Sequence, residues 1–119
     1  MAELPTPEEY ERWETPHRAF HLGLVAHAGT RIVMTIAQLS DHAERYRRFY
    51  STEAPRGFER GMREHRAIVE ACLARDAGAA AERLARHYSS IALGTIAVLA
   101  PEYDPVLVRT ALHSVICKE

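Results

Sequence analysis

Apolar residues recur along most of the chain at intervals of three and four positions, the spacing of one face of an α-helix. The clearest stripe lies between residues 30 and 50, and others follow over 58–72, 80–98 and 106–115. We find no stretch of alternating apolar and polar residues of the kind that is typical of a half-buried strand. The pattern therefore predicts an all-α fold, an antiparallel helical bundle with short connections.

Each predicted helix has positions that should face the core. In the long helix they are Ile32, Ile36, Leu39, Ala43, Tyr46 and Tyr50. In the next two helices they are Phe58, Met62, His65, Val69, Cys72, and Ala80, Leu84, His87, Ile91, Val98. In the last helix they are Val106, Leu107, Ala111 and Val115.

Residues that favour helix ends divide these segments. Thr6, Pro7 and Glu9 form a capping-box start, and Pro16 predicts either a fresh helix or a kink. That helix should stop near Gly29, and Thr30 should cap the next one. Residues 51–57 read as a loop. The remaining expected boundaries are a cap at Asp76, an end at Pro101 and a start at Pro105.

Four histidines stand out against this pattern. His65 and His87 occupy positions where the stripes call for an apolar residue, and His17 and His21 lie four residues apart on one helix face. Residues at that spacing have Cβ atoms roughly 6 Å apart, so both imidazoles can reach one ion. A buried imidazole without partners costs roughly 1–3 kcal/mol, and one shared divalent cation would satisfy all four. Zinc is the first choice, and nickel, iron or manganese are alternatives.

Two arginines are candidates for binding a carboxylate beside that ion. Arg47 and Arg83 lie near the predicted stripes of their helices, and a guanidinium can hold a carboxylate through two hydrogen bonds. The simpler interpretation of each is a solvated arginine. Surface positions are expected for His27, His42 and His113, which fit the stripes poorly.

Composition narrows the function classes. The chain has 119 residues, 47% of them hydrophobic, and a formal net charge of −1, so a single domain over 1–119 is expected, without the basic excess of a nucleic-acid or membrane-surface binder. No apolar run approaches the ~18–20 residues of a membrane-spanning helix, and the N-terminus is unlike a signal peptide. Cys72 and Cys117 are expected to be reduced, mostly buried thiols of a cytoplasmic protein.

The histidine motifs give the chain a family resemblance. It resembles the FCD effector domain of FadR-subfamily GntR transcription regulators, whose signature runs Asp-x-x-Phe-His, a small residue, Gly and Asn, then Glu-His, Gly-Asp and a final His. The corresponding segments are His17-Arg18-Ala19-Phe20-His21, Ala28-Gly29-Thr30, Glu64-His65-Arg66, Arg75-Asp76 and Arg86-His87. The match extends from about residue 8 to residue 100.

This resemblance implies an all-helical bundle that binds a divalent metal and a small organic acid, with the acid modulating DNA binding. By position the metal ligands would be His21, His65 and His87, with His17 in place of the family's Asp. Thr30 stands where the family has Asn, and Pro16 directly before the first ligand is a further departure. We expect a non-enzymatic homodimer that contacts DNA only through a winged helix-turn-helix, and we find no such segment here. We expect the first helices of the effector domain to be missing or shortened, which predicts some exposed apolar surface.

Two other functions remain open from the sequence. A helical bundle with a catalytic or oxygen-related metal is the first, because Glu14 and His17 have the Glu-x-x-His spacing of di-iron proteins, although no second copy occurs. Glu64, the neighbour of His65, would be its candidate base but points about 100° away on the helix. The second is a structural interaction domain whose histidines are ordinary core residues.

Overall fold

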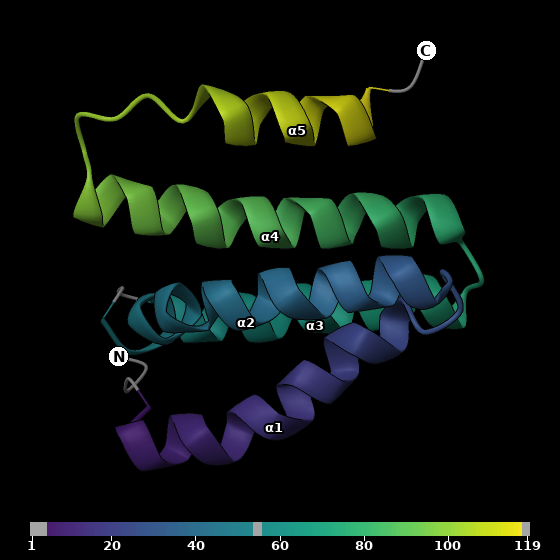
Figure 1. Ribbon diagram of the computed structural model, residues 1–119, viewed down its shortest axis with the longest axis horizontal. Helices are drawn as coiled ribbons and strands as arrows, with labels where there is room; N and C mark the ends of the chain where they lie inside the picture. Colours follow the sequence, from purple (N-terminus) through teal and green to yellow (C-terminus); the bar gives the residue numbers. More distant parts are fainter. Residues whose placement is uncertain (1–4, 54–55, 118–119) are drawn as a thin grey trace.

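The structure is a computed structural model that describes residues 5–53 and 56–117, and these residues form an antiparallel helical bundle (Figure 1). The helices are α1 (Pro7–Leu24), α2 (Thr30–Glu53), α3 (Gly57–Leu73), α4 (Ala77–Leu99) and α5 (Val106–Ile116). No strand occurs within the described ranges, so the all-α prediction is confirmed. In the same ranges, no helix combines the length and the hydrophobicity that crossing a membrane requires.

Several helix ends lie where the sequence predicts them. Thr6 and Glu9 form a reciprocal capping box, in which Glu9 N donates to Thr6 Oγ1 at 3.2 Å and Thr6 N donates to Glu9 Oε2 at 2.7 Å. Asp76 Oδ1 caps α4 by accepting from the backbone N–H of Ala79 at 2.9 Å. Helix α4 ends just before Pro101, and α5 begins directly after Pro105.

Other boundaries differ from the prediction. Pro16 starts no new helix, because α1 continues through it; Arg12, whose carbonyl loses its helical partner there, is exposed to water. Helix α1 ends at Leu24, earlier than expected, and Thr30 is the first residue of α2 rather than its cap. The predicted loop at 51–57 is shorter, because α2 continues to Glu53; residues 54 and 55 of that loop lie outside the described residues.

The buried interior is small and unusually polar. Helix α3 packs along α4, α4 is flanked by α5, and α2 contacts α1, α3 and α4. The buried apolar residues are Tyr10, Tyr50, Ile68 and Ala71. The buried polar residues are His17, His21, Ser51, His87 and Thr95. Imidazole rings therefore take a place in this core that aliphatic side chains usually fill.

Two glycines allow the helices to close on Tyr50. A Cβ at Gly57 would lie 2.5 Å from the Tyr50 carbonyl oxygen, and one at Gly94 would lie 2.5 Å from Tyr50 Cε2. The Tyr50 ring thus packs directly against the backbone of α4, which holds α2, α3 and α4 together at the level of the buried histidines.

The predicted core stripe of α2 is wrong over much of its length. Ile32, Leu39 and Tyr46 are 53%, 62% and 42% exposed, and Tyr50 is the buried member of the stripe. The physical reason is that Leu39 and Tyr46, with the half-buried Ile36 and Ala43, face a cavity between α2 and α4 rather than packed side chains. The exposed apolar surface that the sequence predicts is therefore present.

The interface of α3 is also rotated relative to the prediction. Val69 and Cys72 are exposed, whereas Ile68 and Ala71 are buried against the bundle. Similar corrections apply to other predicted core positions, which are exposed: Val98, Val106, Leu107 and Ala111. The expectation of mostly buried thiols is wrong as well, because both cysteines are exposed.

Candidate metal centre

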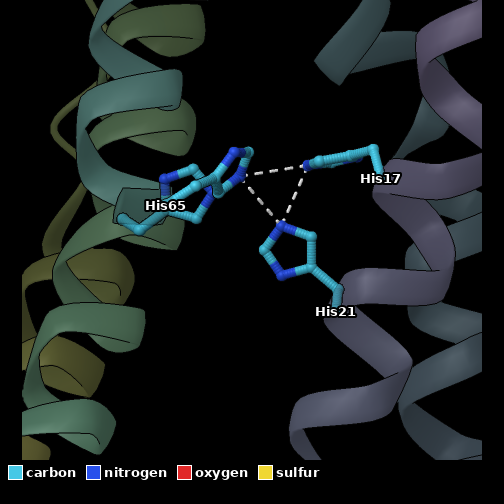
Figure 2. Close-up of side chains that lie close together, drawn as sticks. His17, His21 and His65 are labelled. Carbon is cyan, nitrogen blue, oxygen red and sulfur yellow. Dashed lines mark hydrogen bonds between the residues drawn. The ribbon is translucent and has the colours of Figure 1, made fainter. Parts of the chain in front are cut away.

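Four histidines converge in the middle of the bundle. His17 and His21 lie on consecutive turns of α1, His65 lies on α3 and His87 lies on α4, and each offers a ring nitrogen within 4.8 Å of those of the others. Figure 2 shows His17 and His21 reaching from α1 toward His65 on the opposite side of the site. His17, His21 and His87 are buried and His65 is half-buried. The convergence that the sequence predicts from the spacing of these histidines is therefore present.

Hydrogen bonds alone cannot account for all of these close contacts. The Nε2 atoms of His17, His21 and His65 form a triangle with sides of 2.9, 3.1 and 3.2 Å, and His87 Nε2 lies 3.1 Å from that of His65. A neutral ring nitrogen carries either one hydrogen or one lone pair in the ring plane, never both. In any triangle of such atoms, at least one pair is therefore two donors or two acceptors. A cation removes the conflict, because every nitrogen then presents its lone pair.

The distances fit a shared ion. Donors bound tetrahedrally at about 2.0–2.1 Å from zinc lie about 3.3 Å from one another, and donors at right angles lie about 2.9 Å apart. Four of the six separations, at 2.9–3.2 Å, fall within or close to that range, and the other two, from His87 to His17 and to His21, are at most 4.8 Å. The donor set of neutral imidazoles suits zinc, nickel or iron. The residues present therefore fit a divalent transition metal.

Burial keeps three of these rings neutral. Burial and, to a smaller extent, the neighbouring imidazoles lower the pKa of His21 to about 2, that of His87 to about 3 and that of His65 to about 4. Near neutral pH these rings are therefore unprotonated and have lone pairs available for a metal.

Side chains outside the cluster orient the rings. Glu64 Oε2 lies 3.2 Å from His87 Nδ1, and the Tyr88 hydroxyl lies 3.0 Å from His21 Nδ1. A proton held on Nδ1 by such a partner leaves the Nε2 lone pair facing the centre, the arrangement common to metal-ligating histidines. Glu64 thus contacts the back of a ring rather than the point where the Nε2 atoms meet.

A scan against family models matches the FCD domain over residues 1–90. The chain belongs to the FCD domain family. These domains are the C-terminal effector-binding domains of GntR-family regulators, which are regulatory proteins rather than enzymes. Neither the curated proteins nor the solved structures that were searched contain a match to this chain.

An acidic side chain lies directly behind the His17 ring. Glu14, one turn earlier on α1, places Oε2 3.4 Å from His17 Nδ1. Burial favours the neutral acid, but hydrogen bonds from His17 and Arg47 outweigh it and lower the pKa of Glu14 to about 2. The carboxylate is therefore ionised, and it brings a negative charge next to the cluster. On the opposite side of His17, Trp13 stacks on the ring with centroids 3.9 Å apart.

The two predicted effector arginines lie in different environments. Arg47 is largely buried and donates to Glu14 Oε1 and to the Ser40 carbonyl at 2.8 Å each. Its buried Nε has no hydrogen-bond partner within residues 5–53 and 56–117. Arg83 is exposed, and its guanidinium donates to the carbonyl of Ala67 on α3. Arg83 is not among the residues that line the two cavities described below. The structure thus brings Arg47, and not Arg83, beside the histidines.

The other histidines lie where the sequence predicts. His27, His42 and His113 are exposed, as expected for residues that fit no stripe. Sequence reasoning missed the outer partners Glu14 and Tyr88. The spacing of Glu14 from His17 was visible as Glu-x-x-His, but nothing local in the sequence indicates that Tyr88 reaches His21 from another helix.

One small cavity is lined by histidines of the cluster, and a larger cavity next to it shares Arg47 and Ile91 in its walls. The small cavity has a volume of only about 20 Å³, and its lining includes His17, His65 and His87 together with Trp13 and Phe58. That space is close to the ~10–15 Å³ minimum for one water molecule. The other cavity, between α2 and α4, holds about 650 Å³, which is in the range of small-molecule sites. Arg47 therefore stands between the cluster and a space large enough for a ligand.

Proposed function

We propose that this FCD domain is a metal-dependent sensor of a small carboxylic acid within a GntR-family transcription regulator. The carrying observation is the set of four converging imidazole nitrogens, three of which are mutually close and cannot all be paired by hydrogen bonds. His17, His21, His65 and His87 would hold a divalent cation, with zinc as the first choice and nickel, iron or manganese as alternatives. When bound, that cation supplies a positive charge that attracts an acid.

We assign Arg47 as the residue that binds the carboxylate of the effector beside the histidines. Its charge is balanced by Glu14, but its buried Nε still has a hydrogen to donate toward a bound acid. Arg83 was the other sequence candidate, and its exposed position on α4 supports a role at the surface more than one beside the cluster.

In the cell, we propose, the domain acts as a cytoplasmic homodimer. Acid binding would change the affinity of a winged helix-turn-helix for its DNA operator, by altering how the bundle presents that segment. Exposed apolar side chains that do not line the large cavity, such as Ile32, Val98 and Leu107, are compatible with a partner subunit.

The test is the metal content of tag-free protein together with its response to acids. We expect one zinc per chain, and expect His65→Ala and His87→Ala to lose it. His113→Ala is the matched control, because it removes an exposed imidazole outside the cluster and should leave the metal content unchanged. Thermal unfolding of the zinc-loaded chain is then followed with a panel of carboxylic acids, at least one of which should raise the midpoint. Metal-free protein, or metal-loaded protein that responds to no acid, would contradict the proposal.

A further inference from the structure

The cavity between α2 and α4 has apolar walls along nearly its whole length. Ile36, Leu39 and Ala43 contribute from α2, and Ile91, Ile96 and Leu99 contribute from α4. On α4 the lining extends from Tyr88 to Leu99, about 16 Å at the rise of an α-helix. Among the described residues that line it, Arg47 is the one that carries a charge. An occupant of this space must therefore be apolar over most of its length.

Two residues of the lining have buried polar atoms without a hydrogen-bond partner among the described residues. Thr95 is 6% exposed, and its hydroxyl has no hydrogen-bond partner among the described residues. The helical threonines Thr35 and Thr52 instead donate to the carbonyl one turn earlier, at 2.9 and 2.7 Å. Arg47 Nε is the second buried atom without a partner. Arg47 Nε can only donate and the Thr95 hydroxyl can donate, so a ligand group that accepts hydrogen bonds would satisfy both.

We propose that this cavity binds a monocarboxylic acid with a long aliphatic body, its acid group at Arg47 and Thr95 and its chain along Leu39, Ile96 and Leu99. The proposal rests on the proposed function and narrows its ligand class. The small space beside the histidines supports it, because about 20 Å³ leaves room there for little more than a water and the body of an acid must lie in the larger cavity.

The charges of the lining argue against a di- or tricarboxylic acid. Arg47 is already paired with Glu14 at 2.8 Å, and the lining offers no second cation for another carboxylate. A second carboxylate among these aliphatic side chains would lose its hydration without gaining a partner. An aliphatic chain gains free energy in the same place, because its burial removes apolar surface from water.

Calorimetric titration of the tag-free, zinc-loaded chain tests the proposal with decanoate, octanoate, citrate, succinate and decanol. We expect decanoate to bind, and octanoate to bind roughly tenfold more weakly because it lacks two methylenes. Citrate, succinate and decanol should show no measurable binding. Binding of citrate or succinate without decanoate would overturn this inference and leave the proposed function standing, whereas the absence of binding by every acid tried would count against both. If decanol bound as tightly as decanoate, the role of the acid group would be overturned. If the chain formed a dimer whose interface fills the cavity and prevents decanoate from binding, the cavity would not be a ligand site.

Three variants separate binding in the cavity from adsorption to the surface. Leu39→Asn places an amide in the cavity wall at a residue that is 62% exposed, so the fold should tolerate it. Leu73→Asn is the matched control, because Leu73 is 80% exposed and not part of the lining. Leu39→Asn and Thr95→Val should each weaken decanoate binding about tenfold, and Leu73→Asn should leave it unchanged. Equal affinities in all three would contradict the proposal.

Discussion

His17 is the residue at which this chain departs most from the pattern of the family it resembles. An imidazole there keeps a nitrogen donor but lacks the negative charge of the family's Asp. In the structure Glu14 lies 3.4 Å behind that ring and is ionised, so the charge is supplied from one turn earlier on the same helix. The same carboxylate holds Arg47 at 2.8 Å. Glu14 therefore connects the histidine cluster to the arginine that borders the larger cavity.

Replacing Glu14 with Gln tests this role. The amide keeps the size of the side chain and can still accept from Arg47, but it removes the charge behind His17. We expect zinc affinity to fall by about 10–100-fold, the usual effect of losing an outer-shell partner. Competition titration with a zinc chelator measures it. Glu11→Gln is the control, because Glu11 is exposed and pairs with Arg48 at 3.4 Å, away from the histidines. Equal affinities of the two variants would argue against a positioning role for Glu14.

At the scale of the helices, the prediction from sequence depends on whether a signal is local. The capping box at Thr6 and the cap at Asp76 were predictable, because each involves residues three apart in the chain. The four converging histidines were also predictable, because His17 and His21 share a face by spacing and His65 and His87 interrupt apolar stripes. The outer partner Tyr88 was not, because its contact with His21 depends on how α1 and α4 are placed.

The core was harder to predict than the helices for a related reason. Helical periodicity identifies an apolar face but not what that face contacts. On α2 part of the apolar face borders a cavity, so Leu39 and Tyr46 are exposed. On α3 the buried face is shifted by one residue, to Ile68 and Ala71, and a shift that small is within the breadth of an apolar stripe.

Two glycine substitutions test the packing of α2 against α4. Gly94→Ala places a methyl group 2.5 Å from the Tyr50 ring, so the ring or the helices must shift. Gly23→Ala is the matched change on α1, where a Cβ meets nothing within 4 Å. We expect Gly23→Ala to stabilise the protein by up to about 1 kcal/mol through helix propensity. Gly94→Ala should destabilise it by about 1–3 kcal/mol through overpacking. Denaturant unfolding of both variants at one metal concentration gives the comparison, and similar stabilities would show that Tyr50 does not hold these helices together.

At the scale of the whole molecule, the histidines replace part of an apolar core. The radius of gyration is 14.6 Å, against about 13.5 Å for a compact domain of this length. Few apolar side chains are fully buried, and the centre of the bundle consists of rings that repel or mispair without a cation. A metal that binds the folded chain should therefore contribute a large share of its stability.

Metal removal measures that share. We expect a strong chelator to lower the thermal midpoint of wild-type protein by more than 10 °C, since binding at 1,000 times Kd contributes about 4 kcal/mol and each kcal/mol shifts a domain of this size by several degrees. Differential scanning calorimetry with and without added zinc gives the shift. His87→Ala should start from the lower midpoint and respond little to the chelator, whereas His113→Ala should behave like the wild type. A chelator that leaves the wild-type midpoint unchanged would point to a structural bundle.

The metal-free protein should also become less stable as the pH falls. The pKa values of His21, His65 and His87 are lowered by burial to about 2, 4 and 3, whereas in the unfolded chain each is about 6.5. Below that pH the unfolded chain binds up to three protons that the folded chain does not. The free energy of unfolding therefore falls as the pH drops from 7 toward 4, with a slope proportional to that number of protons. His65→Gln removes one of these groups and should reduce the slope by about one proton, while His113→Gln should keep the wild-type slope. Urea unfolding in the presence of a chelator, at several pH values, measures the slopes. Stability that stays constant over this range would mean that the rings titrate as they do in water, and so are not desolvated in the folded protein.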